Sequence, residues 1–146
     1  MSRLPHPRAP GLEAGVTEPM IRTLVETFYA RIRRDPVLGP IFEGAVDDWP
    51  AHLDKLCAFW SSVMLMTGQY KGKPIPVHAA LPAIGAGHFA RWLALFRTTA
   101  EEACPPAAAA LFLERADRIA ESLQLGLAIH RGESVVPPFL VRAETA

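Results

Sequence analysis

Two histidines flank the stretch of this chain in which chemistry is easiest to place. His52 lies in a strongly periodic apolar segment, and His78 follows in a stretch interrupted by prolines. Imidazole nitrogens are among the commonest ligands of metal ions in proteins. If the chain folds back between these two residues, their rings can face one flat space, which is the geometry of a haem pocket.

Each candidate residue also has an ordinary explanation. A lone histidine on an apolar helix face, such as His52, is more often a hydrogen-bonded core residue than a ligand. His78 alone indicates less, because loop histidines are mostly solvated. Tyr29, Trp60 and Trp92 can be packing residues whose polar atoms bond to the backbone. A functional site is favoured by their combination, an inward tyrosine and histidine with a loop histidine and clustered aromatic residues.

The sequence lacks the common motifs of catalytic and metal sites. It contains no glycine-rich phosphate loop, no Gly-x-Ser-x-Gly and no His-Glu-x-x-His. Cys57 and Cys104 lie far apart, and the absence of Cys-x-x-Cys-His means that any haem would be held without thioether links. We therefore expect the chemistry to belong to a non-covalently bound cofactor.

Length and charge restrict the class of protein. The 146 residues suit one domain, and half of them are apolar, as in an ordinary globular protein. Fifteen basic residues balance fifteen acidic ones, so no overall field favours nucleic acid or an anionic membrane. No signal peptide and no apolar run of about 18 residues is present. We expect a cytoplasmic protein with neither nucleic acid nor a membrane as partner.

Helices must position the candidate side chains. Thr17 can cap a first helix, which should end at Asp35 because the residue before Pro36 is pushed out of the helical region. The connection after it carries Ile41 and Phe42 as apolar anchors. The inward positions of this helix follow the i, i+3, i+4, i+7 spacing of a buried face: Ile21, Leu24, Val25, Phe28, Tyr29 and Ile32.

A second helix is expected from Trp49 to about Thr67, capped by Asp47 or Asp48. Three prolines within residues 74–82 then leave room for little more than one helical turn. The expected inward face of the second helix is Trp49, His52, Leu53, Leu56, Phe59, Trp60 and Val63.

Two more helices complete the expected fold. One begins after Gly87 and ends before Pro105, with Trp92 on its apolar face, and the last covers residues 107–130. No stretch alternates convincingly as a strand, so the predicted class is all-α. We expect residues 1–16 to be a disordered extension, 17–132 to be the folded domain and 133–146 to be a flexible tail.

Three segments resemble the truncated haemoglobins, most closely their third group. They are FYARIRRDPVLGPIF, DWPAHLDKLCAFWSSVMLMTGQYKGKPIPVH and HFARWLALFRTTA. The resemblance covers about residues 17–132, and the glycine-rich motifs typical of the first two groups are absent. It implies a truncated globin domain, a two-over-two helical sandwich around haem b, with the segment before the proximal histidine mostly unwound.

The resemblance also implies roles for individual residues. His78 would be the proximal ligand of the haem iron, and Tyr29, His52 and Trp92 would form the distal, ligand-binding side. A neutral imidazole can hold ferrous iron axially and leave the opposite site open, where tyrosine and tryptophan can donate hydrogen bonds. The residues expected to contact the haem are Phe28, Phe42, Leu53, Leu56, Trp60 and Tyr70.

A polar distal side indicates what the haem would do. Several hydrogen-bond donors should slow the release of a bound ligand. We therefore expect reversible binding of dioxygen and other small diatomic ligands for redox chemistry rather than oxygen delivery. Nitric oxide dioxygenation and a peroxidase-like reaction stay open, with an unidentified reductase as partner. A haem-based gas sensor that signals to a partner protein, and an all-α interaction module without cofactor, are the alternatives.

Overall fold

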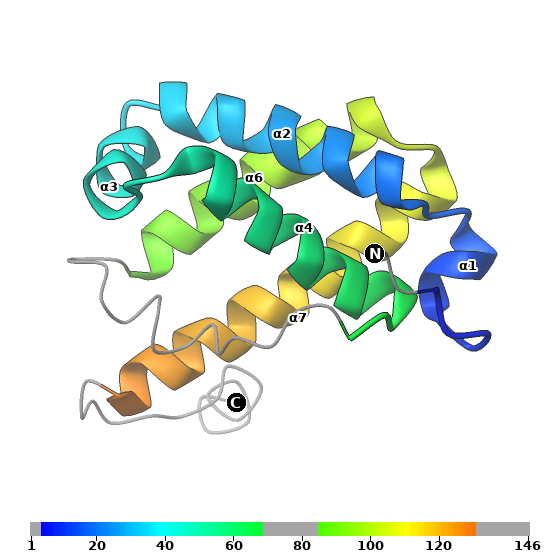
Figure 1. The fold of residues 1–146 in the computed structure, drawn as a ribbon. Coiled ribbons are helices and arrows are strands. Elements are labelled where there is room, and N and C mark those ends of the chain that lie inside the picture. Colours follow the sequence, from blue (N-terminus) through cyan, green and yellow to red (C-terminus); the bar gives the residue numbers. More distant parts are fainter. Residues whose placement is uncertain (1–3, 69–84, 131–146) are drawn as a thin grey trace.

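The computed structural model describes residues 4–68 and 85–130, without the side chains of 127–130. Within these ranges the chain forms helices and no strand, which confirms the all-α class. α2 and α4 pair in one layer and α6 and α7 in the other, the expected two-over-two sandwich (Figure 1). The helices are α1 Pro10–Ala14, α2 Glu18–Arg34, α3 Leu38–Ala45, α4 Trp49–Leu65, α6 Ala86–Ala103 and α7 Pro106–His130.

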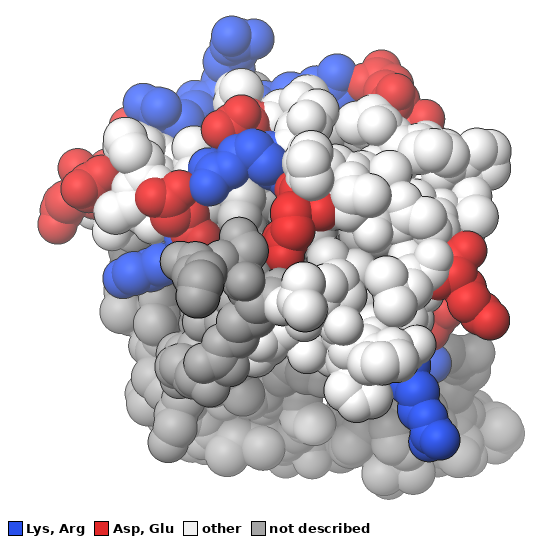
Figure 2. Space-filling model, turned by 45° about the vertical axis from the view of Figure 1, so that its right-hand side comes forward, with Lys and Arg blue, Asp and Glu red and all other residues white. Residues whose placement is uncertain are grey.

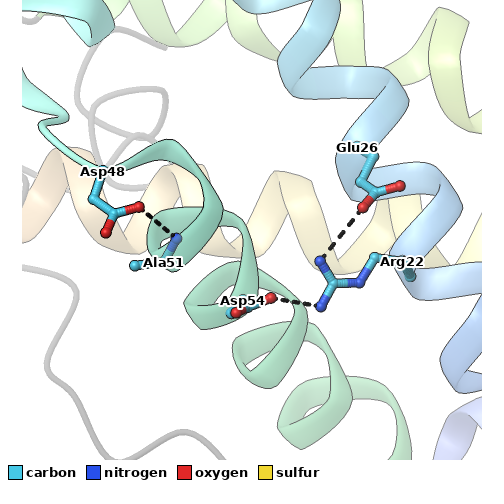
Figure 3. Close-up of polar contacts among 5 residues, drawn as sticks. All are labelled: Arg22, Glu26, Asp48, Ala51 and Asp54. Atoms are coloured by element: carbon cyan, nitrogen blue, oxygen red, sulfur yellow. Dashed lines mark hydrogen bonds and ion pairs between the residues drawn. The ribbon is translucent and has the colours of Figure 1, made fainter.

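Side-chain caps start the two helices of the first layer. The Thr17 hydroxyl accepts a hydrogen bond from the Met20 amide at 3.3 Å at the beginning of α2. At the beginning of α4, the Asp48 carboxylate accepts one from the Ala51 amide at 3.1 Å (Figure 3). Both caps satisfy amide groups that a helix start leaves without a partner, and both were expected from the sequence.

The buried face of α2 is the predicted one. All six of the residues expected on it are buried, and they pack against α4 and α6. The buried face of α4 differs from the predicted one. Seven residues were expected to point inward, and only Trp60 among them is fully buried. The Ser61 hydroxyl lies within 2.7 Å of both Glu18 and Thr67, which satisfies it in the core. The fully buried residues of α4 are Trp60, Ser61, Met64 and Leu65.

Residues 4–16 do not match the expected disordered extension. The His6 amide donates to the Leu65 carbonyl at 2.9 Å, and α1 packs on both α4 and α7. Gly11 is buried at this contact, where a Cβ would lie 2.5 Å from the Met64 carbonyl oxygen. A five-residue helix has no apolar period and is not stable alone, so its contacts with α4 hold it in place. The expected tail, residues 133–146, lies outside the described residues.

The corner between α2 and α3 is built around one carboxylate. Asp35 accepts hydrogen bonds from the amides of Val37 at 3.0 Å and Leu38 at 2.8 Å. It also forms an ion pair with Arg91 of α6 at 2.7 Å. The Arg91 bond, assisted by the two amide bonds against the cost of desolvation, lowers the pKa of Asp35 to about 2. This carboxylate therefore joins three helices, and α3 replaces the irregular connection that we expected.

Charges of both signs alternate over the outer surface. Arg22 of α2 reaches Asp54 of α4 at 2.7 Å and Glu26 at 3.5 Å (Figure 3). These groups are largely exposed, so such pairs contribute little to stability. On the face in Figure 2, acidic and basic side chains lie next to each other beside an uncharged area. Among the described residues, no helix is long and apolar enough to cross a membrane.

Replacing Gly11 with alanine should lower the free energy of unfolding by about 1–3 kcal/mol, because the new methyl meets a backbone carbonyl of α4. Gly44→Ala is the matched control, since Gly44 is also helical and its Cβ would meet no atom within 4 Å. The control should be neutral or slightly stabilising. Urea unfolding measures both, and equal midpoints for the two variants would show that α1 does not dock on α4 in this way.

Candidate functional site

A cavity of about 40 Å³ lies between α2, α3, α6 and α7. Its wall is mostly apolar, with one phenol, one indole and one imidazole among the lining groups. Apolar cavities with a few polar groups are typical of small-molecule and cofactor sites. The lining residues are Tyr29, Leu38, Phe42, His88, Phe89, Trp92, Ala120 and Leu123.

Tyr29 is the central polar group of this cavity. Its side chain is buried, and its hydroxyl shares the cavity wall with the indole of Trp92. An indole can only donate, so toward Trp92 the phenol oxygen can only accept, which leaves the phenol proton for another acceptor. Burial raises the pKa of Tyr29 to about 12, and the neighbouring Trp92 indole opposes that rise. At neutral pH the phenol is therefore an uncharged donor.

His52 lies next to Tyr29. The two ring centroids are 6.0 Å apart in an edge-to-face arrangement, and the half-buried His52 comes from the first turn of α4. The structure thus brings together Tyr29, His52 and Trp92 from α2, α4 and α6, the three residues expected on the distal side. His78 and Tyr70, the expected iron ligand and a haem contact, lie outside the described residues.

Some of the apolar residues expected to contact the haem line the cavity, and others pack behind its wall. Phe42 lines the cavity, and Phe28 meets Trp92 edge to face at 5.3 Å. Trp60 lies deeper, because it stacks on Phe96 at 5.4 Å, and Phe96 stacks in turn on Trp92 at 5.4 Å. Trp60 therefore supports Trp92 through a column of three rings and does not line the cavity.

Two more expected contacts, Leu53 and Leu56, are half-buried on α4 and pack against the core. They lie on the same helix as His52, outside the lining of the cavity between α2 and α7. A haem that contacts them would therefore have to extend from this cavity toward α4.

His88 was missed as a pocket residue. Its Nδ1 accepts a hydrogen bond from the Gly85 amide at 3.0 Å at the start of α6, so the neutral ring carries its proton on Nε2. Phe89 and Leu123 also line the cavity, and neither was expected from the sequence to belong to a site. The spacing of three between Phe89 and Trp92 shows that they share a helix face, but periodicity does not reveal that the face borders a cavity.

Known proteins identify the family to which this arrangement belongs. A sequence profile described as bacterial-like globin matches residues 13–124. Over 113 residues the chain is 33% identical to a group 3 truncated hemoglobin of Campylobacter jejuni, which covers 75% of this chain and 89% of that protein. The chain belongs to the truncated haemoglobins, group III. Membership of the globins implies that it binds haem.

Solved structures agree with this assignment. The crystal structure of a group III truncated hemoglobin from Campylobacter jejuni matches this globin with a TM-score of 0.70 and 34% identity, over 75% of this chain and 89% of that one. A group II truncated hemoglobin from Bacillus anthracis has a TM-score of 0.65 at 22% identity, over 81% and 92% of the two chains. The second likeness shows the fold alone.

The residues around the cavity fit a haem. Phe42, Phe89 and Leu123 offer apolar surface for a flat macrocycle, while Tyr29 and Trp92 place donor groups on one side. The Trp49 indole Nε1 is buried with no hydrogen-bond partner in the described structure. It adds a further unsatisfied donor next to His52 and Tyr29. This donor set suits a ligand that carries partial negative charge.

The raised pKa of Tyr29 predicts a loss of stability in strong alkali. Below about pH 10 the phenol is protonated in both the folded and the unfolded chain. Between about pH 10 and 12 it ionises only in the unfolded chain, so the free energy of unfolding should fall as pH rises through this window. Tyr29→Phe should remove this contribution. Urea midpoints of both proteins at about pH 9 and pH 11 measure it, and an equal alkaline loss in both would contradict the raised pKa.

Proposed function

We propose that this globin binds haem b without a covalent link and reversibly binds dioxygen and other small diatomic ligands beside Tyr29. The observation that carries the proposal is the buried phenol of Tyr29, which lines a cavity together with Trp92 and lies 6.0 Å from the His52 ring, in a truncated globin fold. When bound, ferrous haem supplies a coordination position for the diatomic ligand. A porphyrin exceeds the cavity of about 40 Å³, so haem binding would need more room than the described residues leave there.

His78 is the residue proposed to hold the haem iron. The support is the resemblance of its segment to the third group and the suitability of a neutral imidazole as axial ligand. Two other histidines are less suited to this role. The Nδ1 atom of His88 already accepts a hydrogen bond from the Gly85 amide. His52 lies against Tyr29, on the side proposed for the diatomic ligand.

Tyr29 is the residue proposed to retain the ligand. Because its phenol stays protonated, it can donate to a ligand that has gained negative charge, and such charge-assisted bonds are about twice as strong as neutral ones. Trp92 lines the cavity together with the phenol. Phe28, Leu53 and Leu56, together with Phe42 and Tyr70, are proposed to contact the macrocycle and exclude water. Trp60 is proposed to act behind them, through its stack with Phe96 and Trp92.

Tight retention favours a reaction over delivery. We therefore assign to this globin a redox role with dioxygen, nitric oxide or peroxide, in the cytoplasm and with a reductase as electron donor. Oxygen consumption by the haem-loaded protein with a chemical reductant tests this role. Sustained consumption supports it, whereas a single stoichiometric uptake followed by no turnover favours the gas-sensor alternative, in which the haem reports to a partner protein.

His78→Ala should abolish stable haem binding, because it removes the only proposed bond from the protein to the iron. The measurement is the Soret absorbance per chain after loading with haem, with and without added imidazole, which should restore the band. His52→Ala is the comparison and should keep about one haem per chain. A normal band in His78→Ala together with its loss in His52→Ala would reverse the assignment.

Tyr29→Phe should speed dioxygen release roughly ten- to a hundredfold, since a hydrogen bond to a charged acceptor contributes about 1.5–3 kcal/mol. Trp92 could then donate to the ligand directly and reduce the effect, so Tyr29→Phe combined with Trp92→Phe is the sharper variant. Stopped-flow release kinetics measure both. Release at the parent rate in both variants would leave Tyr29 as a packing residue only.

A further inference from the structure

The His52 ring contacts Trp49 as well as Tyr29. Trp49, the first residue of α4, places its ring 5.5 Å from the His52 ring at an interplanar angle of 89°. The same ring lies 6.3 Å from Tyr29. Since Tyr29 and His52 are 6.0 Å apart, the three rings form a triangle. His52 therefore cannot turn away from Tyr29 without disturbing its edge-to-face contact with Trp49.

Trp49 is itself held from the surface. The guanidinium carbon of Arg33, on α2, lies 4.6 Å from the centroid of the Trp49 ring. The Arg33 Nε donates to the Glu43 carboxylate of α3 at 2.7 Å, and both side chains are 46% exposed. A continuous row of contacts thus leads from an exposed ion pair through Trp49 to His52.

The choice of tryptophan at this position is costly for packing alone. Its Nε1 is buried without a hydrogen-bond partner in the described structure, and a buried donor left unsatisfied destabilises a fold. Phenylalanine or leucine would fill the space without that cost. Tryptophan, however, has the best ring face for a cation and a long edge for a neighbouring ring, and Trp49 makes both contacts.

We propose that Trp49 is a positioning residue that holds the His52 ring beside Tyr29, and that Arg33, braced by Glu43, holds Trp49. Through His52 these residues set the rate at which small diatomic ligands reach the pocket. This inference rests on the proposed function. It adds Trp49, Arg33 and Glu43 as residues that act on the pocket through the orientation of His52.

Flash photolysis of the carbon monoxide complex of the full chain tests the proposal. Trp49→Leu removes the Trp49 contact of the His52 ring and should speed association about two- to tenfold. Arg33→Gln should speed it about two- to fivefold. The matched control is Arg34→Gln, which removes the neighbouring positive charge on α2 and leaves Arg33 in place; its rate should equal the parent's. Unchanged or slower association in Trp49→Leu would overturn the proposal.

A double-mutant cycle separates positioning from a general loosening of the fold. If Trp49 acts through His52, Trp49→Leu should have no further effect on the association rate in a His52→Ala background. Equal effects in both backgrounds would overturn the proposal, because a merely structural change does not depend on His52.

The chemical shifts of the His52 ring protons give a readout that needs no ligand binding. The Trp49 ring current should displace them, so Arg33→Gln should shift them and Arg34→Gln should not. No difference between these variants would also overturn the inference. A chain that takes up no haem would refute the proposed function, and the His52 shifts, measured on the haem-free chain, would still decide whether Trp49 and Arg33 orient this ring.

Discussion

A phenol buried in an aromatic core needs a hydrogen-bond partner, and the pocket of this globin is arranged around that requirement. The donor within reach is the Trp92 indole of α6, which lines the same cavity. An unsatisfied hydroxyl in the interior costs of order 1–3 kcal/mol. This pair therefore links α2 to α6, and because an indole only donates, it leaves the phenol proton for a ligand.

The aromatic rings around this pair hold it in place. Phe28 contacts Tyr29 at 4.9 Å and Trp92 at 5.3 Å, edge to face in both cases. Behind Trp92, Phe96 and Trp60 continue the stack into the core. Because interiors are close-packed and side chains occupy defined rotamers, neither member of the pair can turn without displacing a neighbouring ring.

The two ends of the molecule have different tasks. At one end, Asp35 joins α2, α3 and α6. This junction lies next to the cavity, since Asp35 accepts a hydrogen bond from the amide of Leu38, and Leu38 lines the cavity. At the other end, α1 docks on α4 through Gly11, and Figure 1 shows α1 at the opposite end of the molecule from α3. Changes at α1 should therefore alter stability with little effect on the geometry around Tyr29.

The sequence alone predicted α2, α4, α6 and α7, the caps at Thr17 and Asp48, and the inward positions of Tyr29 and His52. The α2 face and the caps at Thr17 and Asp48 are local effects of periodicity and hydrogen bonding, which a single sequence displays directly. Tertiary structure decided the rest. α1 exists through contact with α4 rather than through its own propensity, and Trp60 became a support rather than a wall because Phe96 stacks between it and Trp92. His88 and the Arg33–Trp49 contact became visible only when α2, α4 and α6 were placed together, since helical spacing shows which residues share a face but not what that face meets.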